Sequence, residues 1–466
     1  MKDRPDAADR AVIDAARDAV IAARERQGQS AAAMRIAVAL SGGRDSMVLL
    51  DALARLAPLA RLAPEASITL SALHVHHGLS PHAEAWVAFC ADECAKRGVP
   101  FTVHRPKVER RGGASLEATA RTARYTAFAS APVDFVALAH HADDQAETLL
   151  LQLLRGAGPH GLAAMPTLRP MPGGAMLLRP FLALSRATIG AYATARGLGW
   201  VDDESNANTD VKRNFIRHEI APRLGSAFPG YPATLARSAA HQAEAAVLAD
   251  ELAQQDALDA IDGEAVGATL DRAALIALDA RAPHRARNLL RWFLRRHGLR
   301  APSTRRLAAM RRQLVHAAPD ARVRLIHDGA EIGIHRGRIC VYPRAVAPFS
   351  ISWHGEASVA LPHGTLEFES CTGAGIANAA LTAGEVTIRA RAGGERIQLD
   401  AARPRRALKR VLLENGMPLW LRESLPLVFC GKTLAVVPGI GVDIAFRAAA
   451  GVAGCNVNWR PNRRED

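Results

Sequence analysis

The residue types between Ser41 and Ser46 suit the binding of a phosphate group. The six residues are Ser41, Gly42, Gly43, Arg44, Asp45 and Ser46. Two adjacent glycines allow a tight turn, so successive backbone N–H groups can point at one anion, and the serines add hydroxyl donors. Asp45 could orient a magnesium ion or its water shell. A plain turn with a serine cap is the alternative, but the position between an apolar run and a helical pattern favours an ATP-binding loop that holds a departing pyrophosphate.

A second polar segment, His140–Thr148, brings carboxylates together. Asp143 and Glu147 are four residues apart, so they share one face of a helix, and Asp144 lies beside them. Such carboxylates could hold Mg²⁺ that bridges ATP phosphates, or bind the ammonium group of an amine substrate. Acidic residues also stabilise a helix start without any catalytic role, and only the nearby phosphate-binding loop makes the catalytic reading the better one. We predict catalytic roles for Asp143, Asp144 and Glu147, with Asp45 and Asp143 as metal ligands.

Two further groups of polar residues have weaker patterns. Arg213 and Arg217 are four residues apart, which suits contacts to a phosphate or a leaving group, although an ordinary solvated helix has the same spacing. Histidines gather at the ends of predicted strands without the helical spacing or the thiolates of a zinc site, so we interpret them as walls of a nucleotide pocket. They are His74, His76, His77, His140 and His141.

The segments around these residues alternate between strand and helix patterns. Short apolar runs predict strands, and a run with helical spacing follows each of them. The predicted strands are 35–40, 68–75, 101–104 and 134–139, and the predicted helices are 11–27, 47–62, 83–97, 116–130 and 145–154. This alternation implies right-handed βαβ units and an α/β fold with a doubly wound, Rossmann-like parallel sheet. Ligands bind such sheets at the carboxyl ends of the strands, where both polar segments fall.

The length and the later patterns predict three domains, because 466 residues exceed one ordinary core. We expect a catalytic domain over 1–225, a mainly helical middle domain over 226–345 and a small α+β domain over 346–466. The expected elements beyond the first domain are helices over 231–255, 284–313 and 404–415, a hairpin pair over 322–343 and a linker over 343–348.

Composition points to a protein of the cytoplasm with a polyanionic partner. The net charge is +13, which favours nucleic acid, although a general basic bias would give the same value. Residues 1–10 are charged and lack the apolar core of a signal peptide, and no apolar run reaches membrane-spanning length. The six cysteines form no CxxC pair, and Cys90 with Cys94 fits a buried helix pair better than a metal site.

The ordered series of motifs resembles one family. The loop SGGRDS is similar to the SGGxDS motif of the PP-loop ATP pyrophosphatases. The later segments resemble tRNA(Ile)-lysidine synthases, and they extend the likeness over nearly the whole chain. They are EATARTARY from Glu117, HHADDQAETLLLQLLRGAG from His140, DESNAN from Asp203, RNFIRHEIAP from Arg213 and LKRVLLENG from Leu408 with Pro418 and 420–422.

The resemblance implies a two-step reaction on the wobble cytidine of the isoleucine tRNA with a CAU anticodon. O2 of the cytidine attacks the α-phosphate of ATP and pyrophosphate leaves. The ε-amine of free lysine then attacks C2 and displaces AMP, giving lysidine. By this likeness Asp45 and Asp143 or Asp144 handle Mg²⁺ and lysine, Glu147 supports the lysine and Arg213 steadies the α-phosphate or the cytidine. The middle and C-terminal domains are expected to contact the tRNA.

Two alternatives remain at this stage. One is another PP-loop enzyme such as a tRNA thiolase, but sulfur carriers generally need a placed cysteine pair, and the sequence has none. The other is a non-catalytic RNA-binding protein with a nucleotide fold. Intact glycines in the loop, together with Asp45, Asp143 and Glu147, argue against a decayed site. The sequence leaves open whether the chain forms a homodimer.

Overall fold

The structure is a computed structural model of the chain, which divides into two compact units, Met1–Leu248 and Ala249–Asp466. The described residues are 4–28, 33–60, 68–78, 80–106, 116–202, 204, 208–263, 267–318, 323–343, 348–362, 364–417 and 419–461.

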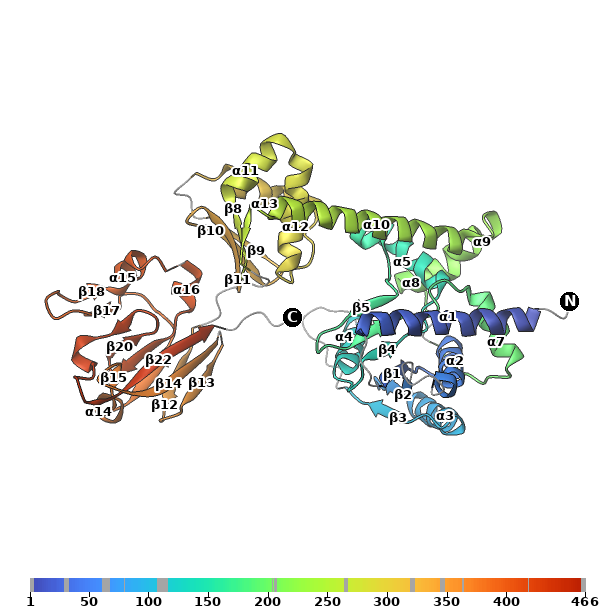
Figure 1. Cartoon of the computed structure of the whole chain (residues 1–466), viewed down its shortest axis with the longest axis horizontal. Helices are drawn as coiled ribbons and strands as arrows, with labels where there is room; N and C mark the ends of the chain where they lie inside the picture. Colours follow the sequence, from blue (N-terminus) through green and yellow to red (C-terminus); the bar gives the residue numbers. More distant parts are fainter. Residues whose placement is uncertain are drawn as a thin grey trace. The chain divides into compact units, whose positions relative to one another are not determined.

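The first unit is built on a six-stranded sheet with the order β3-β2-β1-β4-β6-β5 (Figure 1). Its strands are β1 (Met34–Ala39), β2 (Ile68–Val75), β3 (Phe101–His104), β4 (Phe135–Ala137), β5 (Leu168–Pro170) and β6 (Met176–Leu178). All neighbours run parallel except β5, which pairs antiparallel with β6. The predicted parallel sheet is confirmed in its first four strands. The sequence pattern missed β5 and β6 because three-residue strands are too short to show a periodicity.

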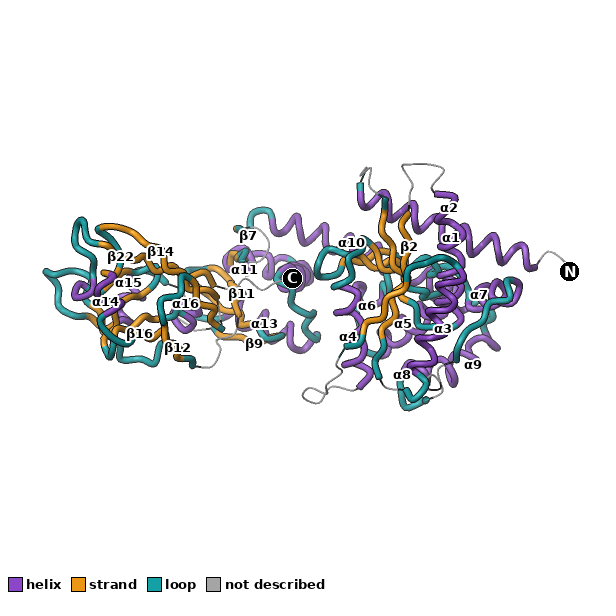
Figure 2. The backbone as a smooth tube through the Cα atoms, turned by 90° about the horizontal axis from the view of Figure 1, so that it is seen from below, coloured by secondary structure: helices purple, strands orange, loops and turns teal. Residues whose placement is uncertain are grey.

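Helices cover both faces of this sheet because alternate side chains of its strands enter two separate cores. Ile36 and Val38 of β1 pack in one core with residues of the helices α1, α2, α3 and α7, whereas Ala37 packs in the other with Phe128 of α4. Figure 2 shows the strands between these two sets of helices. The helices are α1 (Arg4–Gln27), α2 (Arg44–Ala60), α3 (Ala83–Lys96), α4 (Leu116–Ala129), α5 (Ala142–Leu154), α6 (Pro159–Leu162) and α7 (Arg186–Ala195). Both Cys90 and Cys94 are free and buried in α3, as predicted.

A run of helical segments follows the sheet domain. It comprises α8 (Lys212–Phe215), the π-helical turn η3 (Ile216–Ile220), α9 (Ala221–Ala227) and α10 (Tyr231–Ala257). The helix predicted over 231–255 is thereby confirmed. Helix α10 continues across the boundary between the two units.

The start of the second unit combines helices with a sheet, so the expectation of a mainly helical middle domain was too simple. Its helices are α11 (Arg272–Arg281), α12 (Pro283–Arg296) and α13 (Thr304–His316). Five strands form an antiparallel sheet with the order β7-β8-β11-β10-β9. They are β7 (Ile261–Asp262), β8 (Thr269–Asp271), β9 (Arg324–His327), β10 (Ala330–His335) and β11 (Arg338–Pro343). The long arginine-rich helices dominate the sequence pattern, and β7 and β8 are too short to register beside them.

The predicted hairpins of this sheet are confirmed at both turns. Asp328 and Gly329 have φ values of 48° and 74°, and Arg336 and Gly337 have 50° and 77°. Two consecutive residues of positive φ are typical of a type I′ turn, whose twist matches that of the strands it joins.

The rest of the second unit is an α+β arrangement of short antiparallel strands, as the sequence predicts. One sheet has the order β12-β16-β19-β20-β21, a second has the order β13-β14-β22-β15, and β17 pairs with β18. The helix predicted over 404–415 is the shorter α15 (Leu408–Glu414). Most of the predicted linker lies outside the described residues.

The other elements of this region are β12 (Ser350–Trp353), β13 (Ser358–Leu361), β14 (Gly364–Thr372), β15 (Ile376–Ala377), α14 (Asn378–Thr382), β16 (Val386–Arg389), β17 (Arg396–Ile397), β18 (Arg406–Ala407), α16 (Leu419–Ser424), β19 (Leu427–Cys430), β20 (Thr433–Val437), β21 (Gly441–Val442), η4 (Ile444–Phe446) and β22 (Ala453–Pro461). Within the described part of the chain, no helix has the length and apolar character needed to cross a membrane.

Candidate active site

The loop Ser41–Ser46 leads from the carboxyl end of β1 into α2, which begins at Arg44. Gly42 has a φ of 85°, in the left-handed region that side chains disfavour. A Cβ at this position would lie 2.8 Å from Cγ2 of Val201. The Gly42 carbonyl accepts a hydrogen bond of 3.0 Å from the Val201 N–H, so the turn is held against the chain that follows α7. Position 42 therefore requires glycine for two independent reasons.

The two serines brace the loop from inside. The Ser46 hydroxyl donates to the Gly43 carbonyl at 2.8 Å and lies 3.1 Å from the Ser41 hydroxyl. The Gly43 N–H donates to the Ser41 hydroxyl at 3.3 Å. Because hydroxyl groups rotate freely, a phosphate oxygen could replace these internal contacts and receive donors from both serines. The start of α2 adds the positive end of a helix to the same place.

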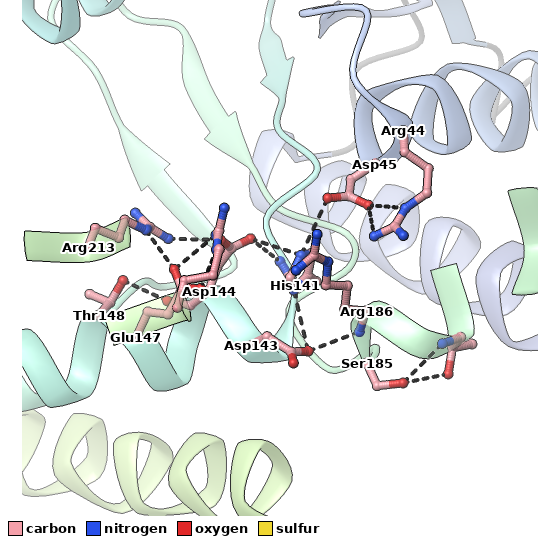
Figure 3. Close-up of polar contacts among 12 residues, drawn as sticks. Arg44, Asp45, His141, Asp143, Asp144, Glu147, Thr148, Ser185, Arg186 and Arg213 are labelled. Carbon is pink, nitrogen blue, oxygen red and sulfur yellow. Dashed lines mark hydrogen bonds and ion pairs between the residues drawn. The ribbon is translucent and has the colours of Figure 1, made fainter. Parts of the chain in front are cut away.

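A buried histidine joins carboxylates from α2 and α5 (Figure 3). His141 Nε2 lies 3.4 Å from Asp45 Oδ2 and 3.5 Å from Asp144 Oδ2, and its Nδ1 lies 3.6 Å from Asp143 Oδ2. Asp45 also accepts hydrogen bonds of 3.0 and 2.9 Å from Nε and Nη2 of Arg44. The two polar segments predicted from the sequence thus meet at one sheet edge, as their positions after β1 and β4 require.

The electrostatics of this group favour ionised carboxylates around a protonated imidazole. Burial opposes the charge of His141, but its contacts with the Asp143 and Asp45 carboxylates and the charge of Asp144 raise its pKa to about 9. Burial also opposes the charges of the carboxylates. Contact with His141 nevertheless holds the pKa of all three below the ordinary value, helped by Arg44 at Asp45 and by Arg213 at Asp144. The cluster is therefore negatively charged at neutral pH.

One turn further along α5, two arginines form hydrogen-bonded ion pairs with two buried carboxylates. Arg213 donates from Nε to Glu147 Oε2 at 2.8 Å and from Nη2 to Asp144 Oδ1 at 2.9 Å. Arg217 donates from Nε to Glu147 Oε1 at 2.6 Å and from Nη2 to Asp144 Oδ1 at 2.9 Å. Asp144 and Glu147 are only 7% and 4% exposed, so these forked contacts are largely shielded from water. The Arg213 side chain comes from α8, and Arg217 lies in the π-helical turn that follows.

The start of α5 also gives the carboxylates an ordinary structural role. Asp144 Oδ2 accepts the N–H of His141 at 3.1 Å, which satisfies a donor at the helix start. Asp143 Oδ2 accepts the N–H of Arg186, at the beginning of α7, at 2.9 Å. Helix capping and the acidic cluster thus use the same side chains. Stabilisation of the helix start, the alternative to a catalytic role, therefore explains part of the acidic pattern.

The sequence prediction missed two members of this cluster. Arg217 was paired with Arg213 by spacing, but nothing in the pattern showed that both reach Asp144 and Glu147. The second is His141, which the sequence pattern predicts to be a pocket wall and which instead lies between three carboxylates. The helical spacing of Arg213 and Arg217, matched to the spacing of the carboxylates on α5, is the signal that could have found the arginine pair.

Other predicted positions have different surroundings. His74 is buried, and its Nδ1 lies 2.8 Å from the Leu40 carbonyl, so it supports the strand end from which the loop departs. The segment Asp203–Asn208 lies mostly outside the described residues.

The donor set suits Mg²⁺ better than a transition metal. Asp45 and Asp143 offer carboxylate oxygens on side chains that are 32% and 27% exposed, at the edge where a nucleotide would lie. Among the residues that the structure describes, no three His, Cys, Asp or Glu side chains converge as a ready metal site. Mg²⁺ is usually held by one or two carboxylates with substrate phosphates and water, so two carboxylates beside an anion loop fit it.

The sheet, the glycine loop and the acidic cluster together define a nucleotide-binding α/β domain of the PP-loop class. Residues 18–224 match the family described as PP-loop domain. Residues 274–340 match the TilS substrate binding domain, and residues 386–459 match the TilS substrate C-terminal domain.

Comparison with whole proteins extends this match to almost the full chain. The chain is 44% identical over 436 residues to the tRNA(Ile)-lysidine synthase of Nitrosomonas europaea, an alignment that covers 92% of each chain. It is 40% identical over 434 residues to the enzyme of that name from Azoarcus sp., again with 92% of each chain covered. The chain therefore belongs to the tRNA(Ile)-lysidine synthase family, an assignment that confirms the resemblance found in its motifs.

Proposed function

We propose that this chain joins lysine to C2 of the wobble cytidine in the CAU-anticodon isoleucine tRNA, at the expense of ATP, which becomes AMP and diphosphate. The observation that carries this proposal is the meeting of an anion loop and a buried acidic cluster at one sheet edge. Ser41–Ser46 supplies donors for phosphates, and α5 supplies carboxylates for a cation. An enzyme that joins an amine to an ATP-activated base needs both kinds of group within one site.

In the first step, O2 of the cytidine attacks the α-phosphorus of ATP, and the bond from that phosphorus to the diphosphate oxygen breaks. Negative charge then builds on the leaving diphosphate. The N–H groups of the loop and the start of α2 face this charge, and Ser41 and Ser46 add hydroxyl donors. Asp45 and Asp143 would hold Mg²⁺, which when bound neutralises phosphate charge.

In the second step, the ε-amine of lysine attacks C2, and the bond from C2 to the adenylated oxygen breaks so that AMP leaves. The amine must lose a proton to be a nucleophile. Asp144 and Glu147 are the groups that would bind the ammonium, orient it and accept the proton that it loses. Both already carry arginine partners, so an incoming ammonium would share these carboxylates with Arg213 and Arg217. Arg213 would then be released in part to steady the phosphate of the departing AMP.

The remainder of the chain would hold the tRNA. We assign the catalytic role to residues 1–225 and tRNA contact to residues 226–345 and 346–466. Helix α12 carries a basic face, with Arg287, Arg291 and Arg295 spaced four residues apart, which suits a phosphate backbone. Free lysine, ATP and tRNA are all cytoplasmic substrates, and we place the protein in the cytoplasm.

Incubation of the purified chain with ATP, Mg²⁺, radiolabelled lysine and the CAU-anticodon tRNA tests this proposal. The expected result is label in the RNA that requires ATP. A matched tRNA with uridine in place of the wobble cytidine is the control, and it should stay unlabelled. Label in the control RNA, or no label in either RNA, would refute the assigned substrate.

A further inference from the structure

Two arginines flank a tyrosine beside the active site. Arg121 and Tyr125 lie one turn apart on α4, and Arg169 lies on the edge strand β5. The guanidinium carbon of Arg121 is 5.0 Å from the centre of the Tyr125 ring, and that of Arg169 is 5.1 Å from it. Arg121 also donates to the Tyr125 hydroxyl at 3.2 Å. Both arginines are exposed, so the ring holds two positive groups close together at the surface.

A third arginine, Arg179, also interacts with Tyr125 and is almost fully enclosed. Arg179 follows β6 and is only 2% exposed. Its Nη1 donates to the Pro166 carbonyl at 2.7 Å, but its buried Nε has no hydrogen-bond partner. A buried charged group without full pairing is costly, so the fold does not explain Arg179 on grounds of stability.

No counter-ion neutralises the three arginines within the described part of the chain. None of Arg121, Arg169 and Arg179 forms an ion pair with a carboxylate there, whereas Arg213 and Arg217 have two each. Burial lowers the pKa of Arg179, Tyr125 raises it, and the charges of Arg169 and Arg121 lower it further. The protein has thus gathered like charges around a buried donor, an arrangement that an anion would stabilise.

This arginine group adjoins the catalytic edge. Arg179 comes directly after the carboxyl end of β6, and β6 pairs with β4, which leads to His140. Burial lowers the pKa of His140 and the charge of Asp144 raises it, while the charges of Arg179, Arg213 and Arg121 lower it. The strand order therefore places Arg179 beside the strand that leads to His140.

We propose that Arg121, Arg169 and Arg179 form a phosphodiester subsite that takes the RNA backbone next to the nucleotide being modified. This subsite rests on the proposed function, because it deepens the recognition of the same substrate. One buried and two exposed arginines suit two successive phosphates better than a single anion. Arg179 would bind one phosphate, and Arg121 and Arg169 would bind the next phosphate of the RNA chain. The carboxylate of free lysine is the other available anion, but one carboxylate forms a bidentate contact with only one of the three arginines.

Single variants Arg121→Gln and Arg169→Gln test the subsite, with Arg10→Gln as the matched control on α1. Arg10 is an exposed arginine on another helix. Binding of the CAU-anticodon tRNA should weaken about three- to tenfold in each subsite variant at moderate salt, and the slope of log affinity against log salt should fall by about one. The control should bind like the wild type. Unchanged tRNA affinity and slope in both subsite variants would overturn the proposal.

The KM for lysine separates the two sources of anion. We expect it to stay within about twofold of wild type in the subsite variants, because a lost phosphate contact does not touch the amino acid. A rise in the KM for lysine with normal tRNA affinity would show that the arginines hold the amino-acid carboxylate, and it would refute the phosphodiester subsite. The tRNA affinity and its salt slope do not require turnover, so they judge the subsite even where the wild type forms no lysidine. The KM for lysine adds the distinction between the two anions where lysidine forms.

Arg179→Met distinguishes binding from support of the fold. Because the enclosed guanidinium lacks full pairing, the melting temperature should be unchanged or higher, while tRNA binding weakens as in the other variants. A lower melting temperature with normal tRNA affinity would assign Arg179 a structural role and remove it from the subsite.

Discussion

Helices α2 and α5 both start at the carboxyl ends of neighbouring parallel strands, β1 and β4, yet the chain equips the two starts differently. At α2, the loop that leads into the helix contains two glycines and two serines, and its internal hydrogen bonds link neutral groups. At α5, the first two turns carry Asp143, Asp144 and Glu147, and two arginines and a histidine surround them.

This difference shows how one sheet edge can serve substrates of opposite charge. A helix start attracts anions through its unpaired N–H groups. The first turn of α2 carries one carboxylate, Asp45, which pairs with Arg44, so the N–H groups of the loop stay available where phosphates would bind. At α5 the chain satisfies the attraction with its own carboxylates, whose charge Arg213, Arg217 and His141 balance. An incoming ammonium would bind there by replacing one of these cations. On the proposed function, the start of α2 would form an ATP half and Asp144 with Glu147 a lysine half, and Asp143 would hold the metal between them.

Removing a carboxylate from α5 should have the largest effect. Glu147→Gln takes one negative charge from the pair that Arg213 and Arg217 hold, and we expect lysidine formation to fall about 100-fold or more. Stability should fall on the order of 3 kcal/mol because the buried ion pairs are broken. Radiolabelled lysine incorporation and thermal unfolding measure the two effects.

Glu93→Gln is the matched control for that variant. Glu93 is also a buried carboxylate, 8% exposed, and it pairs with Lys96 and Arg97 on α3, outside the site. It should lose stability without a loss of lysine incorporation beyond the unfolded fraction. Equal loss of activity in both variants would mean that Glu147 acts only through stability.

A methyl group in the loop at α2 should have the next largest effect. Gly42→Ala places a Cβ 2.8 Å from Val201 at a φ of 85°, so the loop must shift. We expect a rise in the KM for ATP and about a tenfold to 100-fold loss of kcat/KM. In Gly43→Ala the nearest atom would be 3.4 Å away, which is an ordinary contact, so this variant should lose much less. Similar kinetics in the two variants would contradict the geometry assigned to the loop.

The histidine between the two halves predicts a dependence of stability on pH. The pKa of His141 is raised from 6.5 to about 9 in the folded chain, so its contribution is fully present below pH 6.5 and is lost as pH rises towards 9. The shift corresponds to roughly 3 kcal/mol at most. In metal-free buffer, the melting temperature of the wild type should fall about 5 °C or more over this interval relative to His141→Gln. Parallel curves for the two proteins would show that His141 is neutral between the carboxylates.

The smallest effect is expected from a neutral group on the same helix. The Thr148 hydroxyl donates to the Asp144 carbonyl at 2.7 Å and carries no charge. Thr148→Val should cost about 1 kcal/mol of stability or less and leave lysine incorporation within about twofold. A large loss of activity here would show that the geometry of α5, and not its charge, limits the reaction.

Much of the fold was predictable because its patterns are local. The runs before Ser41 and before His140 are apolar on both faces, as buried parallel strands require, and each leads into a helical pattern. The missed strands are those of two or three residues, such as β8. Its pairing with the distant strand β11 fixes its structure, and it is too short to show a local periodicity. Predicting those strands would require knowledge of their tertiary contacts, which the sequence alone does not reveal.

The residue types of the site were predictable, whereas their pairing was not. Spacing on one helix brings Asp143 near Glu147, but the approach of α8 and the π-helical turn to α5 is a tertiary contact that no local pattern shows. Arg179 gave no signal at all, since a single arginine after an apolar run resembles any strand end. Its significance appears only when its burial and its missing partner are seen.

The most direct test of the divided site follows the two half-reactions separately. Transfer of α-labelled phosphate from ATP to the tRNA without lysine reports the ATP half, and loss of that label when lysine is added reports the lysine half. The account predicts that Gly42→Ala slows the first reaction and that Glu147→Gln slows only the second. If Glu147→Gln slowed label transfer as much as Gly42→Ala does, Glu147 would belong to the ATP half, and the division would be wrong.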